Sequence, residues 1–592
     1  QLSDSVAKLP NNKSKNRYAN IYSCMWKIWI NVVFLTDDHS RVKLQTDGNE
    51  SDYINAGYID SYEGARTFIA SQGPKSDTVK DFWKMIWETN SKVIVMLTNL
   101  MENGKAKCEQ YWPEPGCTLR CGSFEIQLRE ENEKDSYITR TLLVANEDAD
   151  YKPRSISQLH FTTWPDHGVP SSTTGFLRFY HHVKEVMETV SGAPVTVHCS
   201  AGVGRTGTLI GFDILMAEMK KHKSVNVLET VVNMRKDRTL MVQTLEQYIF
   251  LHKLLVEVHL FGSTDFKATE INQKIEEMKR CRNKHGMNGF QVEFQNLELI
   301  GPIDVANEIA AQSCNAKFNR FPGILPYDHS RVKVQIDGNE SDYINAGYID
   351  SYEGARTFIA SQGPKPDTVK DFWKMIWETN SKVIVMLTNL MEKNKVRLIQ
   401  AVAKYKQHNV CTLQLMKKAN MVCWFKIMAK CEQYWPEPGC TLRCGSFEIQ
   451  LREENEKDSY ITRTFIVSQS NQSHKPRSIS QLHFTTWPDH GVPSSTTGFL
   501  RFYHHVKEVM ETVSGTPVTV HCSDGAGRTG VLISVANLVE RIKSENKLDV
   551  FRTVKDLRDM RPKMVTSEAQ YRFIYEVCRK FVEGFATYDN FK

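Results

Sequence analysis

Residues 194–207, with the sequence PVTVHCSAGVGRTG, decide the fold. An apolar run precedes Cys199, a glycine-containing turn leads to Arg205, and a helix-like segment continues to about Met219, so we predict a strand, a tight loop and a helix. Glycines let successive backbone N–H groups turn inward, and a helix N-terminus adds partial positive charge, which suits a dianion such as phosphate. The same field lowers a thiol pKa from about 8.5 toward about 3.5–7.5. The pattern therefore predicts that Cys199 is a thiolate nucleophile beneath a bound phosphate.

The length of this pattern makes it specific. A Cys and an Arg with five residues between them also occur at Cys314 and Arg320, but without glycine and without a preceding apolar run. The longer pattern HCSxGxGRTG occurs twice, at residues 198–207 and 521–530. The glycines of residues 202–207 also fit a dinucleotide-binding fingerprint. That fingerprint needs neither an Arg inside the turn nor a Cys at its head, and no βαβ continuation with an acidic strand end follows, so we favour the phosphate loop.

The loop resembles the signature of the Cys-based protein tyrosine phosphatases. In the sequence WPDHG at residues 164–168, the resemblance implies that Asp166 is the general acid that protonates the leaving phenolate. Arg205 has the planar fork that suits bidentate contact with phosphate. Thr206 corresponds to the hydroxyl that assists breakdown of a phosphocysteine, and His198 is a supporting residue. The other loop positions assigned to phosphate binding are Ser200, Ala201, Gly202, Val203 and Gly204.

Further residues of the first half match the family's substrate and support positions. Tyr18, in the sequence KNRY at residues 15–18, corresponds to a ring that stacks on phosphotyrosine and makes the cleft too deep for phosphoserine. Asn20 falls where the family binds the substrate backbone. Glu102 matches the carboxylate that fixes the signature Arg, and Lys107 matches a lysine near the acid loop.

The segment MVQTLEQY at residues 241–248 resembles the loop that positions the hydrolytic water. Gln243 is the residue expected to hold the water, and Gln247 is its companion. The resemblance implies hydrolysis of protein phosphotyrosine in two steps, through a phosphocysteine. Neither a metal nor another cofactor is expected, because the Arg and the loop amides neutralise the charge.

The chain contains a long internal repeat. Residues 38–102 recur as 328–392 with three changes, and residues 152–200 recur as 475–523 with one change. We therefore predict two tandem phosphatase domains, at residues 1–260 and 261–592, which resemble the cytoplasmic part of receptor-type tyrosine phosphatases. Strand-like runs alternate with helical segments, so each domain should be α/β (α+β), a twisted mixed sheet flanked by helices.

The differences between the copies indicate a weak or inactive, regulatory second domain. Cys522, Arg528 and Asp489 are kept, but Asp524 replaces Ala201 inside the loop. Its carboxylate would sit where phosphate and thiolate must both lie, at a cost of roughly 3 kcal/mol for charges about 5 Å apart. In addition, Phe321 stands in place of Tyr18 and Thr566 in place of Gln243, whereas Glu392, Lys430 and Gln570 are kept.

Two segments depart from the family pattern. Residues 23–36 interrupt the first copy, and about residues 393–429 contain a 33-residue insertion in the second. They are either lids over the cleft or errors in the assembled gene, and we favour errors because long structureless insertions are uncommon in compact domains. If the first insertion is real, an alternative is a catalytically impaired protein that binds or scaffolds phosphotyrosine partners.

Composition limits the partners and the compartment. The 75 basic and 69 acidic residues give a net charge of +6, which indicates a mixed solvated surface and not a nucleic-acid interface. The expected partners are phosphotyrosine-containing proteins, with intramolecular or dimer contacts through the second domain. Fourteen cysteines are too few for a disulfide scaffold, and the Cys117/Cys121 spacing, repeated at Cys440 and Cys444, lacks the further ligands of a zinc site.

The resemblance implies a location at the cytoplasmic side of the plasma membrane. A catalytic thiolate needs a reducing compartment, which agrees with that location. The longest apolar stretch, at residues 26–35, is too short to span a bilayer. Tethering to the membrane is therefore expected through an N-terminal part that this sequence does not include.

Overall fold

The computed structural model describes residues 6–18, 39–46, 51–134, 136–148, 152–299, 305–335, 341–391, 429–469 and 475–589, except residues 167, 171, 191, 263, 353, 490 and 514. These residues form two compact units, Gln1–Ser263 and Thr264–Lys592. The boundary lies three residues after the one expected from the sequence. Nearly all of both insertions, together with Asn20 and Glu392, lie outside the described residues.

The first unit is built on a mixed sheet of nine strands in the order β1-β2-β3-β11-β4-β10-β9-β8-β7. The middle strands β3, β11, β4 and β10 are parallel, and the outer strands pair antiparallel. Two short strands, β5 and β6, form a separate hairpin. The strand bounds are β1 Arg41–Lys43, β2 Tyr53–Ile59, β3 Phe68–Ser71, β4 Val93–Met96, β5 Met101–Glu102, β6 Lys105–Ala106, β7 Thr118–Cys121, β8 Phe124–Glu133, β9 Tyr137–Asn146, β10 Arg154–Phe161 and β11 Val195–His198.

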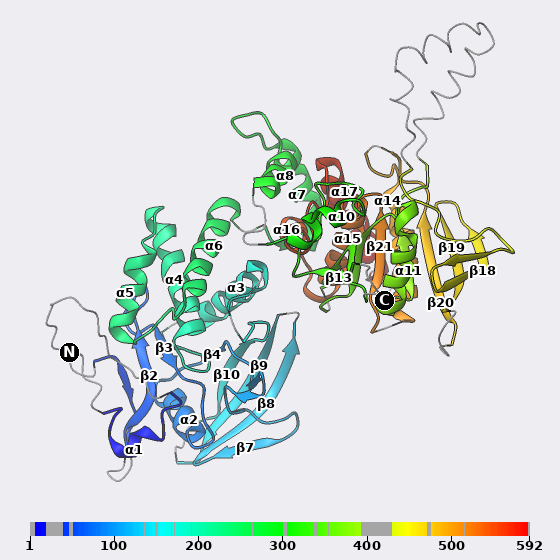
Figure 1. Ribbon diagram of the computed structural model, residues 1–592. Helices are drawn as coiled ribbons and strands as arrows, with labels where there is room; N and C mark the ends of the chain where they lie inside the picture. The colour runs from blue at the N-terminus through cyan, green and yellow to red at the C-terminus, as the bar shows by residue number, and fades with distance from the viewer. Residues whose placement is uncertain are drawn as a thin grey trace, which may run out of the picture. The chain divides into compact units, whose positions relative to one another are not determined.

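Helices cover both faces of this sheet (Figure 1). Because side chains alternate along a strand, Val93 and Val95 of β4 pack with α3–α6, whereas Ile94 and Met96 pack with α2 on the opposite face. Both faces are therefore buried, as a parallel centre requires. The helix bounds are α1 Pro10–Lys13, α2 Val79–Glu88, α3 Thr173–Thr189, α4 Gly204–His222, α5 Val227–Asp237 and α6 Leu245–Phe261.

The strand, loop and helix predicted around Cys199 are present as β11 and α4. The helix begins at Gly204 and continues to His222, three residues beyond the expected end. Lys220, Lys221 and His222 lie in its last turn, where positive charge favours the helix dipole, and Lys223 ends it in the left-handed conformation. The sheet and helix thus hold the signature loop at the carboxyl edge of a central parallel strand, where sites of α/β proteins commonly lie.

The second unit repeats the arrangement with a nine-stranded sheet in the order β13-β14-β15-β21-β16-β20-β19-β18-β17. A small antiparallel pair, β12 and β22, joins the start of this unit to the end of α15. The strand bounds are β12 Phe266–Lys267, β13 Arg331–Lys333, β14 Tyr343–Ile349, β15 Phe358–Gln362, β16 Val383–Met386, β17 Thr441–Cys444, β18 Phe447–Glu456, β19 Tyr460–Gln469, β20 Arg477–Phe484, β21 Val518–Cys522 and β22 Lys547–Leu548.

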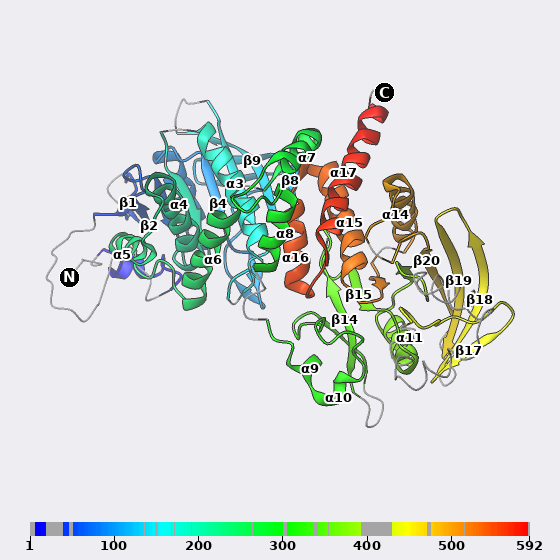
Figure 2. The same cartoon turned by 90° about the horizontal axis from the view of Figure 1, so that it is seen from above.

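Helices also flank the second sheet; α8 packs against α16 and α17, and α7 packs against α8 and α17 (Figure 2). The helix bounds are η1 Ala268–Glu270, α7 Ile271–Arg280, α8 Gly289–Leu299, α9 Glu308–Ala311, α10 Ser313–Ala316, η2 Pro366–Thr368, α11 Val369–Glu378, α14 Thr496–Glu511, α15 Gly527–Glu545, α16 Val550–Met560 and α17 Glu568–Asp589. The predicted fold class, two α/β units each with a mixed sheet flanked by helices, is confirmed.

Candidate active site

The signature loop is a tight cradle that only glycine can complete. Gly202 has φ +71°, and a Cβ atom there would lie 2.2 Å from the carbonyl oxygen of Ser71. Its backbone N–H instead donates to Cys199 Sγ over 3.2 Å. Cys199 is only 4% exposed, so the sulfur lies at the bottom of the loop, where inward N–H groups surround it.

The environment of Cys199 favours its thiolate. Burial alone raises the pKa of the Cys199 thiol. This is outweighed by the hydroxyl and backbone N–H of Thr206, the charge of Arg205 and the N–H of Val203, so the pKa is lowered below its ordinary value. The buried Thr206 hydroxyl has no other hydrogen-bond partner among the described residues. The arrangement can therefore hold negative charge on sulfur.

Glu102 fixes the guanidinium of Arg205. Arg205 Nη1 lies 2.6 Å from Glu102 Oε1, and Nη2 lies 2.9 Å from Oε2, a bidentate pair. Thr98 Oγ1 donates to the same carboxylate over 3.0 Å. Arg205 also donates to the carbonyl oxygens of Leu97 and Pro165. The guanidinium is therefore preorganised before any ligand arrives.

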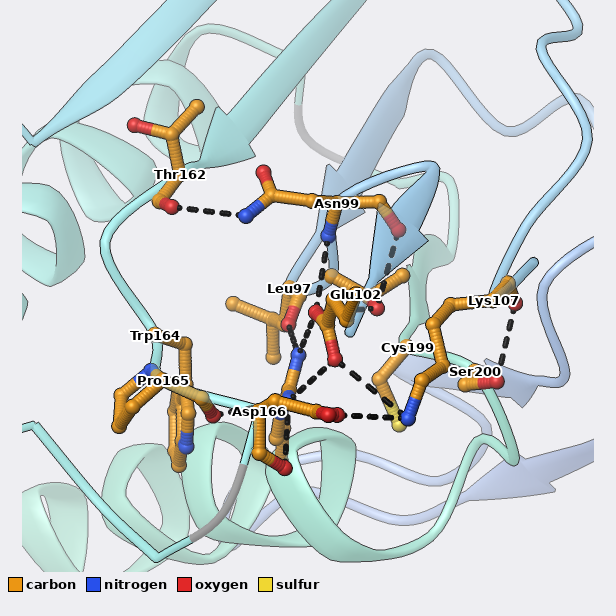
Figure 3. A network of polar contacts seen from close by, with 12 residues as sticks. Leu97, Asn99, Glu102, Lys107, Thr162, Trp164, Pro165, Asp166, Cys199 and Ser200 are labelled. Atoms are coloured by element: carbon orange, nitrogen blue, oxygen red, sulfur yellow. Dashed lines mark hydrogen bonds and ion pairs between the residues drawn. The ribbon is translucent and has the colours of Figure 1, made fainter. Parts of the chain in front are cut away.

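The acid-loop carboxylate of Asp166 lies beside Lys107 (Figure 3), and the amide of Asn103 also contacts it. Lys107 Nζ donates to Asp166 Oδ1 over 2.6 Å, and Asn103 Nδ2 donates to Oδ2 over 2.5 Å. The hydrogen bond from Lys107 is the largest of the effects that lower the pKa of Asp166 to about 2, and the same contact raises the pKa of Lys107. In this conformation Asp166 is a carboxylate.

Trp164 anchors the acid loop in the core. It is 3% exposed and packs edge-on against Phe161, Phe176 and Phe250. Its Nε1 donates to the carbonyl oxygen of Gly168 over 3.2 Å, which closes the turn. The loop is therefore held at one end while Asp166 remains near the surface.

The expected substrate-recognition residue lies at the rim of the cradle. Tyr18 is 37% exposed, and its hydroxyl lies 3.0 Å from Ser200 Oγ. Ser200 Oγ also donates to the carbonyl oxygen of Lys107 over 2.9 Å. Arg17 holds the segment in place, because its backbone N–H donates to Gln72 Oε1 over 2.9 Å. The ring of Tyr18 thus lies beside the phosphate loop.

The two glutamines crowd the start of α4. A Cβ atom on Gly204 would lie 2.8 Å from Gln247 Nε2 and 3.3 Å from Gln243 Oε1. Gln247 also completes a capping box with Thr244 at the start of α6, and its Oε1 accepts the backbone N–H of Gln243 over 2.8 Å. The structure therefore gives Gln247 a second task, holding the loop that carries Gln243.

Sequence reasoning missed an arginine beneath the cradle. Arg238 is fully buried, and its Nε donates to the carbonyl oxygen of Gly202 over 2.8 Å. Its Nη2 donates to Asn55 Oδ1 over 2.7 Å and to the carbonyl oxygen of Ala201 over 3.1 Å. Because Arg238 binds these carbonyl oxygens, the N–H groups of the loop point toward the opposite side, where a ligand would bind. Arg561 makes the same contacts in the second unit, and only the folded structure reveals them.

In the second unit, a carboxylate of the loop itself occupies the anion cradle. Asp524 Oδ1 accepts the backbone N–H groups of Ala526 and Gly527 over 2.9 and 3.1 Å. The Cys522 thiol donates to the same oxygen over 3.0 Å. Burial is the largest effect and Asp524 the next in raising the pKa of Cys522 to about 11. Arg528 still donates to the carbonyl oxygen of Pro488, next to Asp489.

A buried cysteine whose thiol pKa is lowered, beside a braced arginine in a loop of inward N–H groups, defines an enzyme site for phosphoryl chemistry. Among the described residues, no three His, Cys, Asp or Glu side chains converge as a metal site requires. A family model described as Protein-tyrosine phosphatase matches residues 12–257, 315–420 and 401–580. The chain belongs to the protein-tyrosine phosphatase family.

Curated relatives of this family carry the receptor type in their names. The chain is 38% identical to human receptor-type tyrosine-protein phosphatase alpha, over 100% of this chain and 68% of that protein. It is 39% identical to the human epsilon protein, over 94% of this chain and 76% of that protein. It is 37% identical to tyrosine-protein phosphatase Lar of Drosophila melanogaster, over 99% of this chain and 26% of that protein. The predicted resemblance is confirmed. In the described part of the chain, no helix has the length and apolarity to cross a membrane.

Proposed function

We propose that the first unit hydrolyses phosphotyrosine in proteins through a phosphocysteine. The observation that carries this proposal is the buried Cys199 sulfur, whose pKa is lowered within a loop braced by Arg205 and Glu102. A thiolate in such a loop faces phosphorus, and the guanidinium and amides neutralise the equatorial oxygens in the transition state.

In the first step, the Cys199 sulfur forms a bond to phosphorus while the bond from phosphorus to the tyrosine oxygen breaks. Asp166 supplies the proton that the leaving oxygen needs. Tyr18, at the rim, stacks on the substrate ring. The depth that this ring adds selects the long phosphotyrosine side chain over phosphoserine.

In the second step, water forms a bond to phosphorus, and the phosphorus–sulfur bond breaks. Gln243 holds the water, and Asp166 takes its proton. Thr206 donates to the returning thiolate, the contact that already lowers the pKa of Cys199. The products are tyrosine, inorganic phosphate and the starting enzyme, so protons and bonds balance without a cofactor.

The general-acid role requires Asp166 to be protonated when substrate is bound. In the structure its pKa is about 2, chiefly because of Lys107. A phosphate dianion that enters the cradle raises a neighbouring carboxyl pKa and also competes for the lysine. The negative charge of the bound phosphate therefore favours the protonated form of Asp166, which is the form that can act as a general acid.

We propose a regulatory, nearly inactive role for the second unit, because the Asp524 carboxylate occupies the amides that phosphate would need. Receptor-type relatives support a location on the cytoplasmic side of the plasma membrane, with tethering through a part of the protein that precedes this sequence. Contacts within the chain or between two copies through the second unit belong to the same proposal.

The test is turnover of a phosphotyrosine peptide by the full chain and by its Cys199→Ser variant. We expect the variant to lose essentially all phosphate release while it still binds the peptide. Wild-type turnover in the variant would overturn the proposal. Peptide binding without phosphate release by the unaltered chain would instead favour a scaffold that captures phosphotyrosine proteins.

A further inference from the structure

A buried polar chain runs from β9 to the signature loop. Arg140 Nη1 donates to Gln158 Oε1 over 3.0 Å, and Gln158 Nε2 donates to the Tyr111 hydroxyl oxygen over 2.7 Å. The same hydroxyl lies 2.8 Å from His198 Nε2, and His198 Nδ1 lies 3.3 Å from the carbonyl oxygen of Cys199. All four side chains of the chain are at most 7% exposed.

The direction of these hydrogen bonds is fixed at the arginine end. A guanidinium can only donate, so it binds the amide oxygen of Gln158 and leaves the amide NH₂ to face Tyr111. Since the Tyr111 oxygen accepts from Gln158, its own proton is free to bind His198 Nε2. The other acceptor near that hydroxyl is the sulfur of Met96 at 3.7 Å, which is weak.

This direction selects one tautomer of His198. Burial lowers the pKa of His198 to about 3, so the ring is neutral at physiological pH and carries one proton. If Nε2 accepts from Tyr111, the proton lies on Nδ1 and is donated to the carbonyl oxygen of Cys199. The opposite tautomer would place a nitrogen lone pair against that carbonyl oxygen. The hydrogen bond from His198 Nδ1 therefore holds the carbonyl group of Cys199 in place.

The same arginine begins a second branch, toward Glu102. Arg140 Nη1 lies 3.5 Å from His160 Nδ1, so that nitrogen accepts, and His160 Nε2 donates to the carbonyl oxygen of Thr98 over 2.9 Å. Burial is the main effect that lowers the pKa of His160 to about 4, so this ring is also neutral. Thr98 Oγ1 donates to Glu102, the brace of the signature arginine. One guanidinium thus orders both histidine tautomers.

We propose that Arg140 and Gln158 are positioning residues for phosphotyrosine hydrolysis, because they set the direction of the hydrogen bonds that end at the backbone of Cys199. This deepens the proposed function of the first unit. Neither residue touches the phosphate, and both act through Tyr111 and His198. If that direction is reversed, the loop backbone loses the donor His198 Nδ1–H, and the amides that stabilise the thiolate become less well ordered.

Other groups also face the Cys199 sulfur and bear on its titration. They are the hydroxyl and N–H of Thr206, the guanidinium of Arg205, the N–H groups of Gly202 and Val203, and the nearby Cys108 thiol. Substitution of Gln158 alters none of them directly. If substitution of Gln158 shifts the pKa of Cys199, the effect must therefore be transmitted through Tyr111 and His198.

The second unit contains the same chain, which makes it a matched control. Arg463 donates to Gln481 over 2.9 Å, Gln481 to Tyr434 over 2.6 Å, and Tyr434 lies 2.8 Å from His521. His521 Nδ1 lies 3.4 Å from the carbonyl oxygen of Cys522. A change at Gln481 therefore carries the same folding cost as one at Gln158 but lies in the unit whose cradle is occupied.

The test uses one nearly isosteric substitution to reverse the direction of the hydrogen bonds that link Gln158, Tyr111 and His198. In Gln158→Glu, a carboxylate beside Arg140 accepts from Tyr111, so Tyr111 must accept from His198 Nε2 and the Nδ1 proton is lost. In Gln158→Leu, the amide is gone but Tyr111 still donates to His198. Both variants are made in the full chain. The measurements are kcat and KM on a phosphotyrosine peptide and the pH dependence of Cys199 alkylation by iodoacetate.

We expect Gln158→Glu to lower kcat about fivefold with little change in KM, and to move the alkylation midpoint to higher pH, since one net hydrogen bond is worth about 1 kcal/mol. Gln158→Leu should lower kcat by less than about threefold. In a Tyr111→Phe background, the step from Gln158 to Glu should have no further effect. Gln481→Glu should match the thermal destabilisation of Gln158→Glu and leave peptide turnover unchanged.

Equal losses in Gln158→Glu and Gln158→Leu, or an undiminished effect of glutamate in the Tyr111→Phe background, would mean that Gln158 only fills space and would overturn the proposal. Should the glutamate variant fail to fold, the wild-type chain still decides the matter. In ¹⁵N-histidine-labelled protein, the resonance lost in His198→Asn must be that of a ring protonated at Nδ1. A resonance of the Nε2 tautomer would refute the inference.

Discussion

Replacement of Asp524 by alanine should restore chemistry to the second unit. The carboxylate oxygen of Asp524 accepts two loop N–H groups and the thiol proton of Cys522, so it takes the place that a phosphate oxygen would need. Alanine is the residue that the first unit has at this position, Ala201. The substitution therefore removes a charge and gives the second loop the residue that the first loop already has at this position.

The expected gain in turnover follows from the pKa of the Cys522 thiol. The pKa of Cys522 is about 11, so only about one molecule in 10⁴ carries a thiolate at pH 7. Removal of Asp524 deletes two of the effects that raise this pKa, its charge and its hydrogen bond. A return toward the ordinary value of 9.0 raises the thiolate fraction about a hundredfold. A phosphate about 5 Å from the lost carboxylate gains roughly 3 kcal/mol as well.

The assay uses the full chain with Cys199→Ser, which silences the first unit. Turnover of a small aryl phosphate is compared with and without Asp524→Ala, and iodoacetate alkylation of Cys522 is followed against pH. We expect turnover to rise about a hundredfold and the alkylation midpoint to fall by about two pH units. Thr566→Gln, added to Asp524→Ala, should speed release of phosphate from the phosphoenzyme.

Two results would refute the charge argument. One is a second unit that already matches the first unit before substitution, and the other is turnover that Asp524→Ala leaves unchanged. Deletion of the 33-residue insertion is the matched alternative. If that deletion alone restores turnover while Asp524 stays in place, the defect lies in the segment next to Glu392 and not in the cradle.

Three further predictions concern the first unit. Glu102→Gln leaves the signature guanidinium, whose side chain is 11% exposed, without its charge partner, which should cost about 3 kcal/mol of stability and be visible as a lower melting temperature and a fall in kcat/KM. Lys107→Met removes the main effect that lowers the pKa of Asp166, so that pKa should rise from about 2, and because the acid must be protonated, the alkaline limb of the kcat profile should move to higher pH; an unmoved limb would contradict this. Gly202→Ala should abolish activity, because its Cβ would meet backbone at 2.2 Å, whereas Gly104→Ala, at φ +72° with open space around it, should cost only about 1 kcal/mol in a melting experiment.

The sequence was sufficient for the parts that follow from local pattern. The apolar run before Cys199 and the glycines after it specify a strand, a loop and a helix, and the structure contains them. The duplicated segments fold alike because their residues are nearly identical. The start of α3 at Thr173 is less evident from the sequence, because it rests on Ser172, whose side chain caps the helix through a single hydrogen bond.

The polar residues under the cradle could not be predicted in the same way. Arg140 and Gln158 lie on neighbouring strands and Arg238 follows α5, so no sequence spacing relates them to Cys199. Their importance arises from burial, since a buried donor or acceptor must find a partner. Only the folded sheet brings Arg140 opposite Gln158, in register. Such residues are found by accounting for buried hydrogen bonds, which a one-dimensional pattern does not contain.

The loop carboxylate of the second unit also bears on inhibition. Oxyanions such as vanadate imitate phosphate by accepting the amides of a signature loop. In the second unit those amides already bind Asp524, whereas the first loop directs Gly202 N–H at its cysteine. One equivalent of a tight oxyanion inhibitor per chain should therefore suffice for complete inhibition. A compound that contacts only the signature loop can therefore discriminate between two domains whose surrounding residues are almost the same.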